Sequence, residues 1–337
     1  MTNLRAGLVG LGMMGRNHAR VLATLDGVDL VGIADPTGGI PGAAPVGVPL
    51  FSTIDELLAK GIDYAMVSTP TQYHLQTALF LAGAGIHALI EKPLTTDVES
   101  AREIAQAFEA AGLIGAVGHI ERYNPALQQA RMRIARGDLG ELYQITTRRQ
   151  GPFPGRIADV GVILDLATHD IDLTAWVAQQ DFASVAARTA HRSGRPHEDL
   201  VSITGQLADG TVTNHLVNWL SPMKERVTVM TGERGALVAD TLTADLTFFE
   251  NGLVPTQWAD VARFRGVTEG NMTRFAFAKP EPLRVEHENF RDTLLGKESD
   301  IVTLRQGVAT VGVANAVALS ATTGQVVDVT RVGSEEE

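Results

Sequence analysis

The sequence predicts an α/β protein, in which an N-terminal doubly wound parallel sheet precedes an α+β domain with a large, mostly antiparallel open sheet. A Gly-x-Gly-x-x-Gly run at residues 10–15 lies between a short apolar segment and a helical pattern. Apolar runs then alternate with helical patterns as far as residue 120, and two helices begin with capping boxes, at Thr53 to Glu56 and at Thr96 to Glu99. Residues 181–249 are mostly short β-branched runs separated by turn signals, which is typical of an antiparallel meander.

Length and composition indicate a two-domain enzyme. A chain of 337 residues exceeds the size at which one core usually stops growing, so we expect domains at residues 1–120 and 121–333, with an acidic tail at 334–337. The net charge of −11 argues against a nucleic-acid surface, and no apolar run approaches the ~20 residues of a membrane helix. The absence of cysteine excludes disulfides and thiolate chemistry, and no signal-peptide pattern opens the chain. We therefore expect a cytoplasmic protein that binds neither nucleic acid nor membrane.

The glycine-rich run predicts a dinucleotide site. Gly10 permits a tight turn, Gly12 lets the backbone approach a pyrophosphate, and Gly15 allows the helix to pack on the strand. Met13 and Met14 begin that helix, whose N-terminus attracts an anion. The alternative is a glycine-rich turn that holds no ligand.

Asp35 favours NAD as the cofactor. It ends the second apolar run, 20 residues after the last glycine of the motif, where a carboxylate can accept hydrogen bonds from a ribose diol. The segment from residue 36 to 59 contains no Lys or Arg to receive a 2′-phosphate. The pattern therefore predicts that NAD is preferred over NADP.

Two further strand ends should lie at the same edge of the sheet, where ligands bind in such folds. Thr69 and Pro70 follow one strand, and His74 opens the next helix. Glu91 and Lys92, followed by a proline, close another strand. We expect all five residues beside the cofactor, with the ammonium of Lys92 placed to stabilise a developing alkoxide. The alternative for Lys92 is an ordinary surface lysine.

Asp165, His169 and Asp172 share one face of a predicted helix, because they are four and three residues apart. A His beside a carboxylate is how a general base is oriented, since the acid fixes the tautomer and the other ring nitrogen accepts a proton. Two alternatives remain open: a surface His on a capped helix start, and a zinc or manganese site made by the three side chains. No further ligand is implied, so we predict no metal.

The order and spacing of three motifs resemble the Gfo/Idh/MocA oxidoreductase family. They are Gly10-x-Gly12-x-x-Gly15, Glu91-Lys92-Pro93 and Asp165-x-x-x-His169, and the resemblance extends over nearly the whole chain. It implies a Rossmann domain that binds NAD and a catalytic pair of Lys92 and His169, with Asp165 as the partner of the histidine. It also implies a homo-oligomer, a dimer or tetramer joined through the C-terminal sheet. One departure is that Asp159-Val-Gly161-Val replaces the glycine triplet found in many members.

Residues 118–126, 148–161 and 168–172 look like the branch of UDP-N-acetylglucosamine 3-dehydrogenases. This resemblance implies oxidation of the C3 hydroxyl of UDP-N-acetylglucosamine or its uronate. Between Leu142 and Ala158 there are three arginines and no acid, as a diphosphate would need. Arg148 and Arg149 face opposite ways on a strand, so at most one of them should reach the ligand. The expected substrate-binding residues are Glu121, Tyr123, Asn124, Arg149, Arg156 and His169.

Two other functions remain open at this stage. One is a dehydrogenase of a free sugar or inositol, which would not need the arginines. The other is a nucleotide-sensing pseudoenzyme, because a fold alone does not establish catalysis. The joint presence of Lys92 and His169 favours an enzyme.

Overall fold

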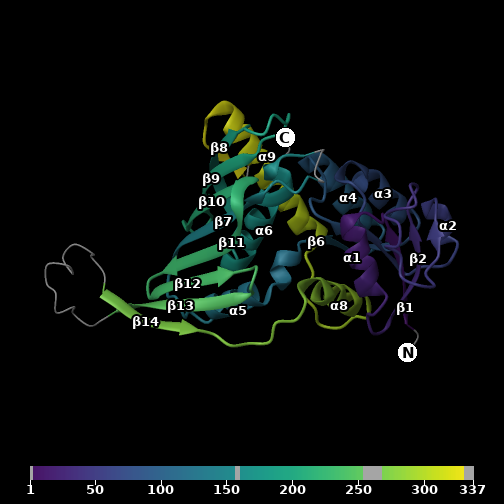
Figure 1. Ribbon diagram of the computed structural model, residues 1–337, viewed down its shortest axis with the longest axis horizontal. Helices are drawn as coiled ribbons and strands as arrows, with labels where there is room; N and C mark the ends of the chain where they lie inside the picture. The colour runs from purple at the N-terminus through teal and green to yellow at the C-terminus, as the bar shows by residue number, and fades with distance from the viewer. Residues whose placement is uncertain (1–2, 156–159, 253–267, 330–337) are drawn as a thin grey trace. The chain divides into compact units, whose positions relative to one another are not determined.

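The computed structural model describes residues 3–155, 160–252 and 268–329. The chain forms two compact units: unit 1 contains residues 1–120 and 280–312, and unit 2 contains residues 121–279 and 313–337 (Figure 1). Residues 280–312 therefore belong with the first unit, whereas the sequence had suggested the second. Arg156, Asp159 and the acidic tail at 334–337 lie outside the described residues.

Unit 1 contains, in the residues described, a six-stranded parallel sheet with the order β3-β2-β1-β4-β5-β6. The order reverses between β1 and β4, which is the switch point at which doubly wound sheets bind nucleotides. All four residues of β4 are buried, as expected of a central parallel strand covered on both faces. The strands are β1 (Leu4–Val9), β2 (Val28–Ala34), β3 (Leu50–Phe51), β4 (Tyr64–Val67), β5 (His87–Glu91) and β6 (Gly115–Gly118).

Helices cover the sheet of unit 1 and enclose two apolar clusters. One cluster packs α3, α4 and the start of α9 against the strands, and the other packs α1 and α8. The helices are α1 (Met13–Leu22), α2 (Ile54–Leu58), the 3₁₀ turn η1 (Thr71–Tyr73), α3 (His74–Gly83), α4 (Val98–Ala110) and α8 (Pro282–Leu294), together with the part of α9 (Leu304–Thr323) up to residue 312.

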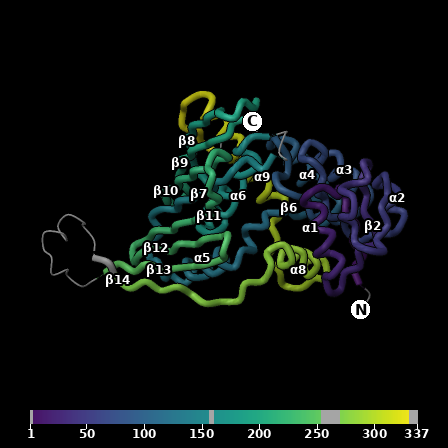
Figure 2. Tube along the Cα trace, viewed as in Figure 1, coloured from purple at the N-terminus to yellow at the C-terminus, as the bar shows by residue number. Residues whose placement is uncertain are grey.

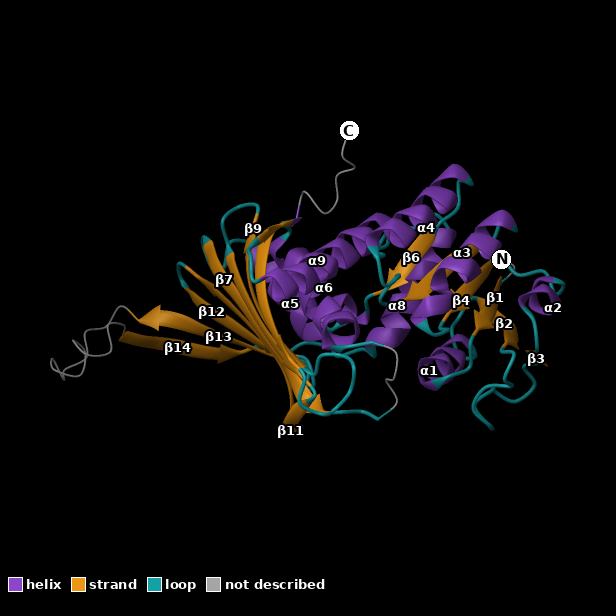
Figure 3. Ribbon diagram, turned by 90° about the horizontal axis from the view of Figure 1, so that it is seen from above, coloured by secondary structure: helices purple, strands orange, loops and turns teal. Residues whose placement is uncertain are grey.

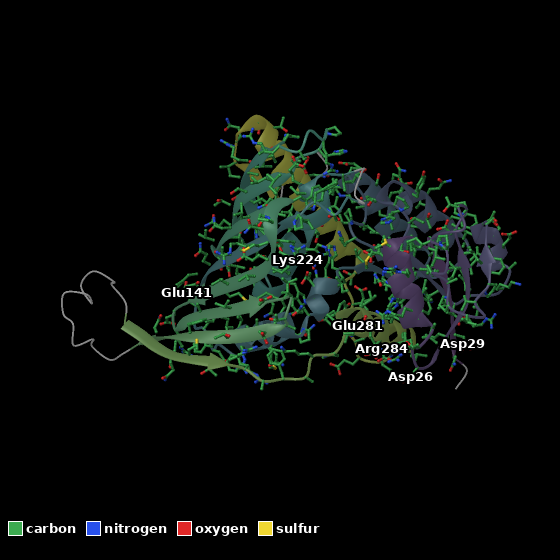
Figure 4. All side chains as sticks on the ribbon, in the orientation of Figure 1. Asp26, Asp29, Glu141, Lys224, Glu281 and Arg284 are labelled. Atoms are coloured by element: carbon green, nitrogen blue, oxygen red, sulfur yellow. The ribbon has the colours of Figure 1, made fainter. Side chains whose placement is uncertain are left out.

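Helix α8 is far from α1 in the sequence but lies beside it (Figure 2). At the first turn of α8, Glu281 pairs with Arg20 of α1, and Arg284 donates to the carbonyl of Thr24 over 3.0 Å; Figure 4 labels Glu281 and Arg284. Phe290 packs edge-on against Tyr64 of β4, with ring centroids 5.4 Å apart. These contacts explain why residues 280–312 join unit 1, which the local pattern of the sequence could not indicate.

One of the two predicted capping boxes is present. Thr53 accepts from the backbone N–H of Glu56, and the carboxylate of Glu56 accepts from the backbone N–H of Thr53. The second prediction was wrong, because the residue that caps α4 is Asp97, which accepts from the backbone N–H of Ser100 over 2.8 Å. A carboxylate at this position also favours the positive end of the helix dipole.

Unit 2 contains, within the described part of the chain, a nine-stranded sheet with the order β14-β13-β12-β11-β7-β10-β9-β8-β15. Among these described strands only β7 and β10 pair in parallel, so the sheet is mostly antiparallel, as predicted. The strands are β7 (Leu142–Pro152), β8 (Phe182–Ala190), β9 (Leu200–Leu207), β10 (Val212–Asn218), β11 (Leu220–Gly232), β12 (Gly235–Asp240), β13 (Asp245–Gly252), β14 (Thr268–Arg274) and β15 (Val327–Asp328).

The helices of unit 2 lie on one face of its sheet, and the opposite face carries no helix among the described residues (Figure 3). They are the 3₁₀ turn η2 (Ile120–Tyr123), which begins at the last residue of unit 1, α5 (Pro125–Ala135), the π-helical turn η3 (Ile163–Ala167), α6 (Thr168–Ala178) and α9 from residue 313. Among the described residues, no helix is both long and apolar enough to cross a bilayer.

Candidate active site

The glycine motif forms the turn between β1 and α1, as predicted. Gly10 has φ +90°, and a Cβ there would lie 2.8 Å from the carbonyl oxygen of Ser68. A Cβ on Gly15 would lie 2.1 Å from the carbonyl oxygen of Gly10, so only glycine lets α1 pack this closely. A Cβ on Gly12 would meet nothing within 4 Å. Gly12 is also the N-cap of α1 and has no side chain to cap it, so the first N–H groups of the helix remain available to an anion.

Asp35 is held at the end of β2 with its carboxylate aimed at this turn. One oxygen accepts from the N–H of Leu11 over 2.8 Å, and the other accepts from the N–H and the hydroxyl of Thr37 over 2.8 and 2.6 Å. Burial raises the pKa of Asp35, but these hydrogen bonds outweigh burial and hold it below its ordinary value. Asp35 is therefore ionised at neutral pH and suited to the diol of an adenosine ribose. Met13, half exposed at 46%, and Met14 begin α1.

His74 joins two of the predicted cofactor-side turns. Its Nε2 lies 2.9 Å from the carbonyl oxygen of Thr69, and its Nδ1 lies 3.1 Å from those of Pro93 and Leu94. Burial lowers the pKa of His74, more than the carbonyls raise it. The imidazole, 1% exposed, therefore ties the turn after β4 to the turn after β5. This is a structural role, whereas we had expected His74 to face the cofactor.

Lys92 is half-buried at the end of β5, and Pro93 follows it through a cis peptide bond. Glu91, which we had expected beside the cofactor, is buried at 8% exposure. One carboxylate oxygen lies 2.8 Å from Nε2 of His18 on α1, and the other accepts from the backbone N–H of Lys92 over 3.0 Å. Both carboxylate oxygens of Glu91 therefore contact groups of unit 1, whereas we had expected this side chain to contact the cofactor.

Asp165 and His169 lie in one continuous helical segment of unit 2. Asp165 is buried within the π-helical turn η3, and His169 is half-exposed in the first turn of α6. The π turn is closed by the N–H of Thr168, which donates to the carbonyl of Ile163 five residues earlier. Such single π turns recur at functional sites. The sequence pattern predicted the helix but not this widened turn.

Glu198 caps the start of this helical segment, and sequence reasoning missed this role. Its carboxylate accepts from the N–H of Ile163 over 3.0 Å, and its carbonyl accepts from the N–H of Val162 over 3.2 Å. A Cβ on Gly161 would lie 2.0 Å from the same carboxylate, so glycine is required for the cap to form. The glycine kept at position 161, where the family triplet is otherwise altered, was the available signal.

Asp172, the third residue of the predicted helix face, pairs with Arg122. Its two carboxylate oxygens accept from Arg122 over 2.8 and 2.6 Å, and both side chains are buried. This bidentate pair engages the carboxylate of Asp172, which was the third ligand of the alternative zinc or manganese site. No group of three or more potential ligands in the described ranges is arranged to hold a metal ion.

Arg149 makes a structural ion-pair network. It is buried under α6, donates to Asp170 over 2.7 Å and donates to Glu121 over 2.8 Å. Burial lowers the pKa of Arg149, but the two carboxylates outweigh burial and raise it. Its neighbour Arg148 faces the other side of the strand, is exposed, and pairs with Glu225 over 2.8 Å, which confirms that the two arginines point in opposite directions. The contacts of Arg149 and Glu121 are therefore with each other and with the protein, and do not support the expected diphosphate contact.

Tyr123 and Asn124 lie at the start of α5 and are buried. Asn124 is the N-cap, accepts from the N–H of Ala126 over 3.0 Å, and donates to the carbonyl of Thr241 over 3.0 Å. An Asn before a proline at the first helical position is a strong cap, and this explains its placement better than a sugar contact does. Arg156 lies outside the described residues, so its contact with a diphosphate stays a prediction.

Family models match both units. Residues 4–119 match the oxidoreductase family with an NAD-binding Rossmann fold, and residues 127–238 match the C-terminal domain of the same family. The chain belongs to the Gfo/Idh/MocA oxidoreductase family. It is accordingly an NAD-dependent oxidoreductase, and residues 4–119, which include the turn between β1 and α1 and Asp35, form its NAD-binding Rossmann fold.

Several Gfo/Idh/MocA relatives are similar over much of the chain. The UDP-N-acetylglucosamine 3-dehydrogenase of Acidithiobacillus ferrooxidans is 33% identical over 64% of this chain and 66% of its own length. The solved structure of that enzyme has a TM-score of 0.83 at 27% identity, covering 96% of this chain and 99% of its own. The WlbA dehydrogenase of Bordetella pertussis, solved with NADH and UDP-GlcNAcA, has a TM-score of 0.78 at 25% identity, over 97% and 98% of the two chains. A scyllo-inositol 2-dehydrogenase of Bacillus subtilis is 31% identical over 54% of this chain and 56% of its own length.

Proposed function

We propose that this oxidoreductase oxidises the C3 hydroxyl of a UDP-N-acetylhexosamine, UDP-N-acetylglucosamine or its uronate, to the 3-keto sugar nucleotide. The observation that carries the proposal is the similarity to the Acidithiobacillus enzyme along both units, with a TM-score of 0.83 over 96% of the chain. The similarity to WlbA, solved with NADH and a UDP-sugar uronate, supports the same substrate class.

A sugar nucleotide also explains where binding energy comes from. The hydroxyls of a lone sugar bind weakly, because water competes for each of them. A diphosphate and a base supply charge and stacking away from the reacting carbon, and that energy can position C3 for reaction. In unit 2, Arg148 and Arg149 are each paired with carboxylates of the protein. We therefore propose that Arg156 binds the diphosphate.

The proposed chemistry uses Lys92 and His169 on the same hydroxyl. NAD, when bound, accepts the hydride from C3. The neutral imidazole of His169 takes the proton of the hydroxyl, and the ammonium of Lys92 donates a hydrogen bond to the oxygen as negative charge develops on it. Asp165 orients the imidazole and favours its protonated form after the transfer. Loss of the hydride from C3 and of the proton from the hydroxyl leaves a carbonyl at C3.

The substrate class can be tested directly. Purified protein is incubated with NAD and a panel of UDP-N-acetylglucosamine, its uronate, free N-acetylglucosamine and myo-inositol, and NADH absorbance is followed. We expect turnover of the UDP sugars, with free N-acetylglucosamine losing both kcat and affinity because the remote binding groups are absent. Turnover of inositol or free sugar as efficient as that of the UDP sugar would replace the proposal with the polyol dehydrogenase function.

The catalytic roles predict a second result. Lys92→Ala and His169→Ala should each lower kcat by about 10²–10⁴-fold, the usual loss for one acid-base group, with the Kd for NAD little changed. Asp165→Asn should lower kcat less and alter its pH profile. Stopped-flow reduction of NAD and titration of NAD binding measure the two quantities. Normal turnover in both alanine variants would remove this assignment.

A dehydrogenase of inositol or a free sugar is the second candidate function, and the relative from Bacillus subtilis is the observation that favours it. A nucleotide-sensing pseudoenzyme is not proposed, because the chain belongs to an oxidoreductase family.

We also propose that the protein is a homo-oligomer joined through unit 2. The face of the sheet without described helices exposes Val212, Phe249 and Met272, of which the last two are register partners. Light scattering should give a dimer or tetramer, and Phe249→Glu combined with Met272→Glu should shift the protein toward monomer.

A further inference from the structure

A buried chain of polar side chains lies behind Lys92 in unit 1. Nδ1 of His18 lies 2.9 Å from Nε2 of His287, and Nε2 of His18 lies 2.8 Å from Glu91. The other carboxylate oxygen of Glu91 accepts from the backbone N–H of Lys92 over 3.0 Å. His18 and His287 are fully buried and Glu91 is 8% exposed. The chain therefore runs from α8, through α1, to the end of β5.

This arrangement costs free energy, so we expect that something in the protein requires it. A buried carboxylate and two buried imidazoles lose hydration, and an apolar cluster of the same volume is often at least as stable. The anion site predicted at the N-terminus of α1 does not require His18, which lies more than one turn further along the helix. The series of hydrogen bonds from His287 ends at the backbone of Lys92, so its function should concern this residue.

We infer that His287 and His18, acting through Glu91, are positioning residues for Lys92. The inference rests on the proposed function, in which Lys92 stabilises the developing oxyanion. Burial raises the pKa of Glu91, but the hydrogen bond and charge of His18, together with Lys92, outweigh it and hold the pKa below its ordinary value. Glu91 is therefore a fixed anion that binds the Lys92 backbone through one oxygen and is itself fixed by His18 through the other.

Glu286 is adjacent to this chain but separate from it. It is 1% exposed, and neither of its carboxylate oxygens has a hydrogen-bond partner in the part of the chain described. Burial, and then the charge of Glu91, raise the pKa of Glu286 well above its ordinary value. The raised pKa favours the protonated form of Glu286, whose shape Glu286→Gln preserves. This variant is the matched control for Glu91→Gln.

The decisive comparison uses two substitutions of His287. Gln places an amide group, which can donate or accept a hydrogen bond, near the position of Nε2 and can keep the bond to His18, whereas Leu removes it. His287→Leu should lower kcat by about ten- to a hundred-fold, the range for a misplaced catalytic group, with the KM for NAD nearly unchanged. His287→Gln should restore most of this loss. Glu91→Gln should resemble His287→Leu, and Glu286→Gln should resemble the wild type.

Thermal melting of each variant separates positioning from folding. A purely structural role lowers the melting temperature of His287→Leu and leaves kcat, measured well below melting, at the wild-type value. That result, or equal kcat in the Leu and Gln variants, would overturn the inference.

A second measurement does not depend on the substrate. Lys92 and the exposed Lys60 are labelled with an amine reagent at limiting time, and the labelled peptides are quantified by mass spectrometry. Labelling of Lys92 should change several-fold in Glu91→Gln while Lys60 is constant, and an unchanged ratio contradicts the inference even where a variant is too unstable for kinetics. Absence of UDP-sugar turnover by the wild type refutes the proposed function alone, because the labelling comparison still reports on Lys92.

Discussion

Asp35 is the residue on which cofactor choice depends most. Its two oxygens are held by Leu11 and Thr37, so the carboxylate cannot turn away from the ribose position without breaking hydrogen bonds to the backbone. A 2′-phosphate placed there would meet a fixed negative charge. No basic residue occurs between residues 36 and 59, so the segment that follows Asp35 supplies no cation to offset the repulsion.

Replacing Asp35 by Ser and Pro36 by Arg should therefore narrow the preference for NAD over NADP. The substitution removes the fixed charge and supplies a guanidinium that can bind the phosphate. The ratio of kcat/KM for the two cofactors measures the effect, with Thr37→Val as a control that keeps the charge but loosens its hold. A wild-type enzyme that uses NADP at least as well as NAD would contradict this reading of the strand end.

Residues that depend on local geometry could be predicted from the sequence, and residues that depend on distant partners could not. Gly10 and Gly15 are required by a turn whose neighbours are close in sequence or in the adjacent strand. Arg149 looked like a ligand for phosphate, because the segment around it contains no acid. Its partners Glu121 and Asp170 are 28 and 21 residues away and only the fold brings them near.

At the scale of elements, the helical segment that carries Asp165 and His169 is defined by its start. Glu198 comes from the loop before β9 and binds two N–H groups at the beginning of η3. The π turn changes the angle between successive side chains, because it holds more residues per turn than an α-helix. A spacing of four residues therefore predicted a shared face, but could not predict the widened turn or the loop that caps it.

Gly161→Ala should disturb this segment specifically. The added methyl would overlap the Glu198 carboxylate, and overpacking of this kind costs about 1–3 kcal/mol. We expect a lower midpoint in urea denaturation and a lower kcat, with NAD binding unchanged because that site is in unit 1. Gly83→Ala, where a Cβ meets nothing within 4 Å, is the matched control and should be neutral or slightly stabilising. Equal effects of the two substitutions would exclude the capping role.

At the scale of the whole molecule, both units contain buried neutral histidines. Burial lowers the pKa of His74 and of His287 in unit 1, and lowers that of His215 in unit 2 to about 4. An unfolded chain binds protons at these positions below a pKa of about 6.5, and the folded chain does not. The unfolded state is therefore favoured as the pH falls from about 7 toward 4. The free energy of unfolding should decrease across this window.

His215→Phe isolates one contribution. The ring is buried in the sheet near Phe182, and its Nδ1 lies 2.8 Å from the hydroxyl of Thr147. Its shift from about 6.5 to about 4 corresponds to roughly 3 kcal/mol of acid destabilisation at the lower pH. The variant should unfold with a smaller loss of free energy between pH 7 and pH 5, measured by urea denaturation. A slope unchanged by His215→Phe would disprove the assignment.

The two sheets were predictable from hydrophobic periodicity, and the path of the chain between the two units was not. Alternating elements gave the parallel sheet, and short β-branched runs gave the antiparallel one. The return of residues 280–312 to unit 1 depends on α8 recognising α1 and β4, through Phe290 and Arg284. No local signal encodes a contact with a surface more than 200 residues earlier in the chain, and only the complementary faces reveal it.

The discontinuity of unit 1 has a consequence for biosynthesis. When residue 120 leaves the ribosome, the surface of Tyr64 that Phe290 covers has no cover, and the covering helix has not been made. At about 5–20 residues per second, α8 and the start of α9 follow on the order of ten seconds or more later. The nascent nucleotide-binding region must wait through that interval with apolar surface exposed, while strands β7 to β14 of unit 2, which precede α8 in the chain, are already made. Chains truncated at residue 279 should therefore bind chaperones, and chains that extend to residue 312 should bind them less.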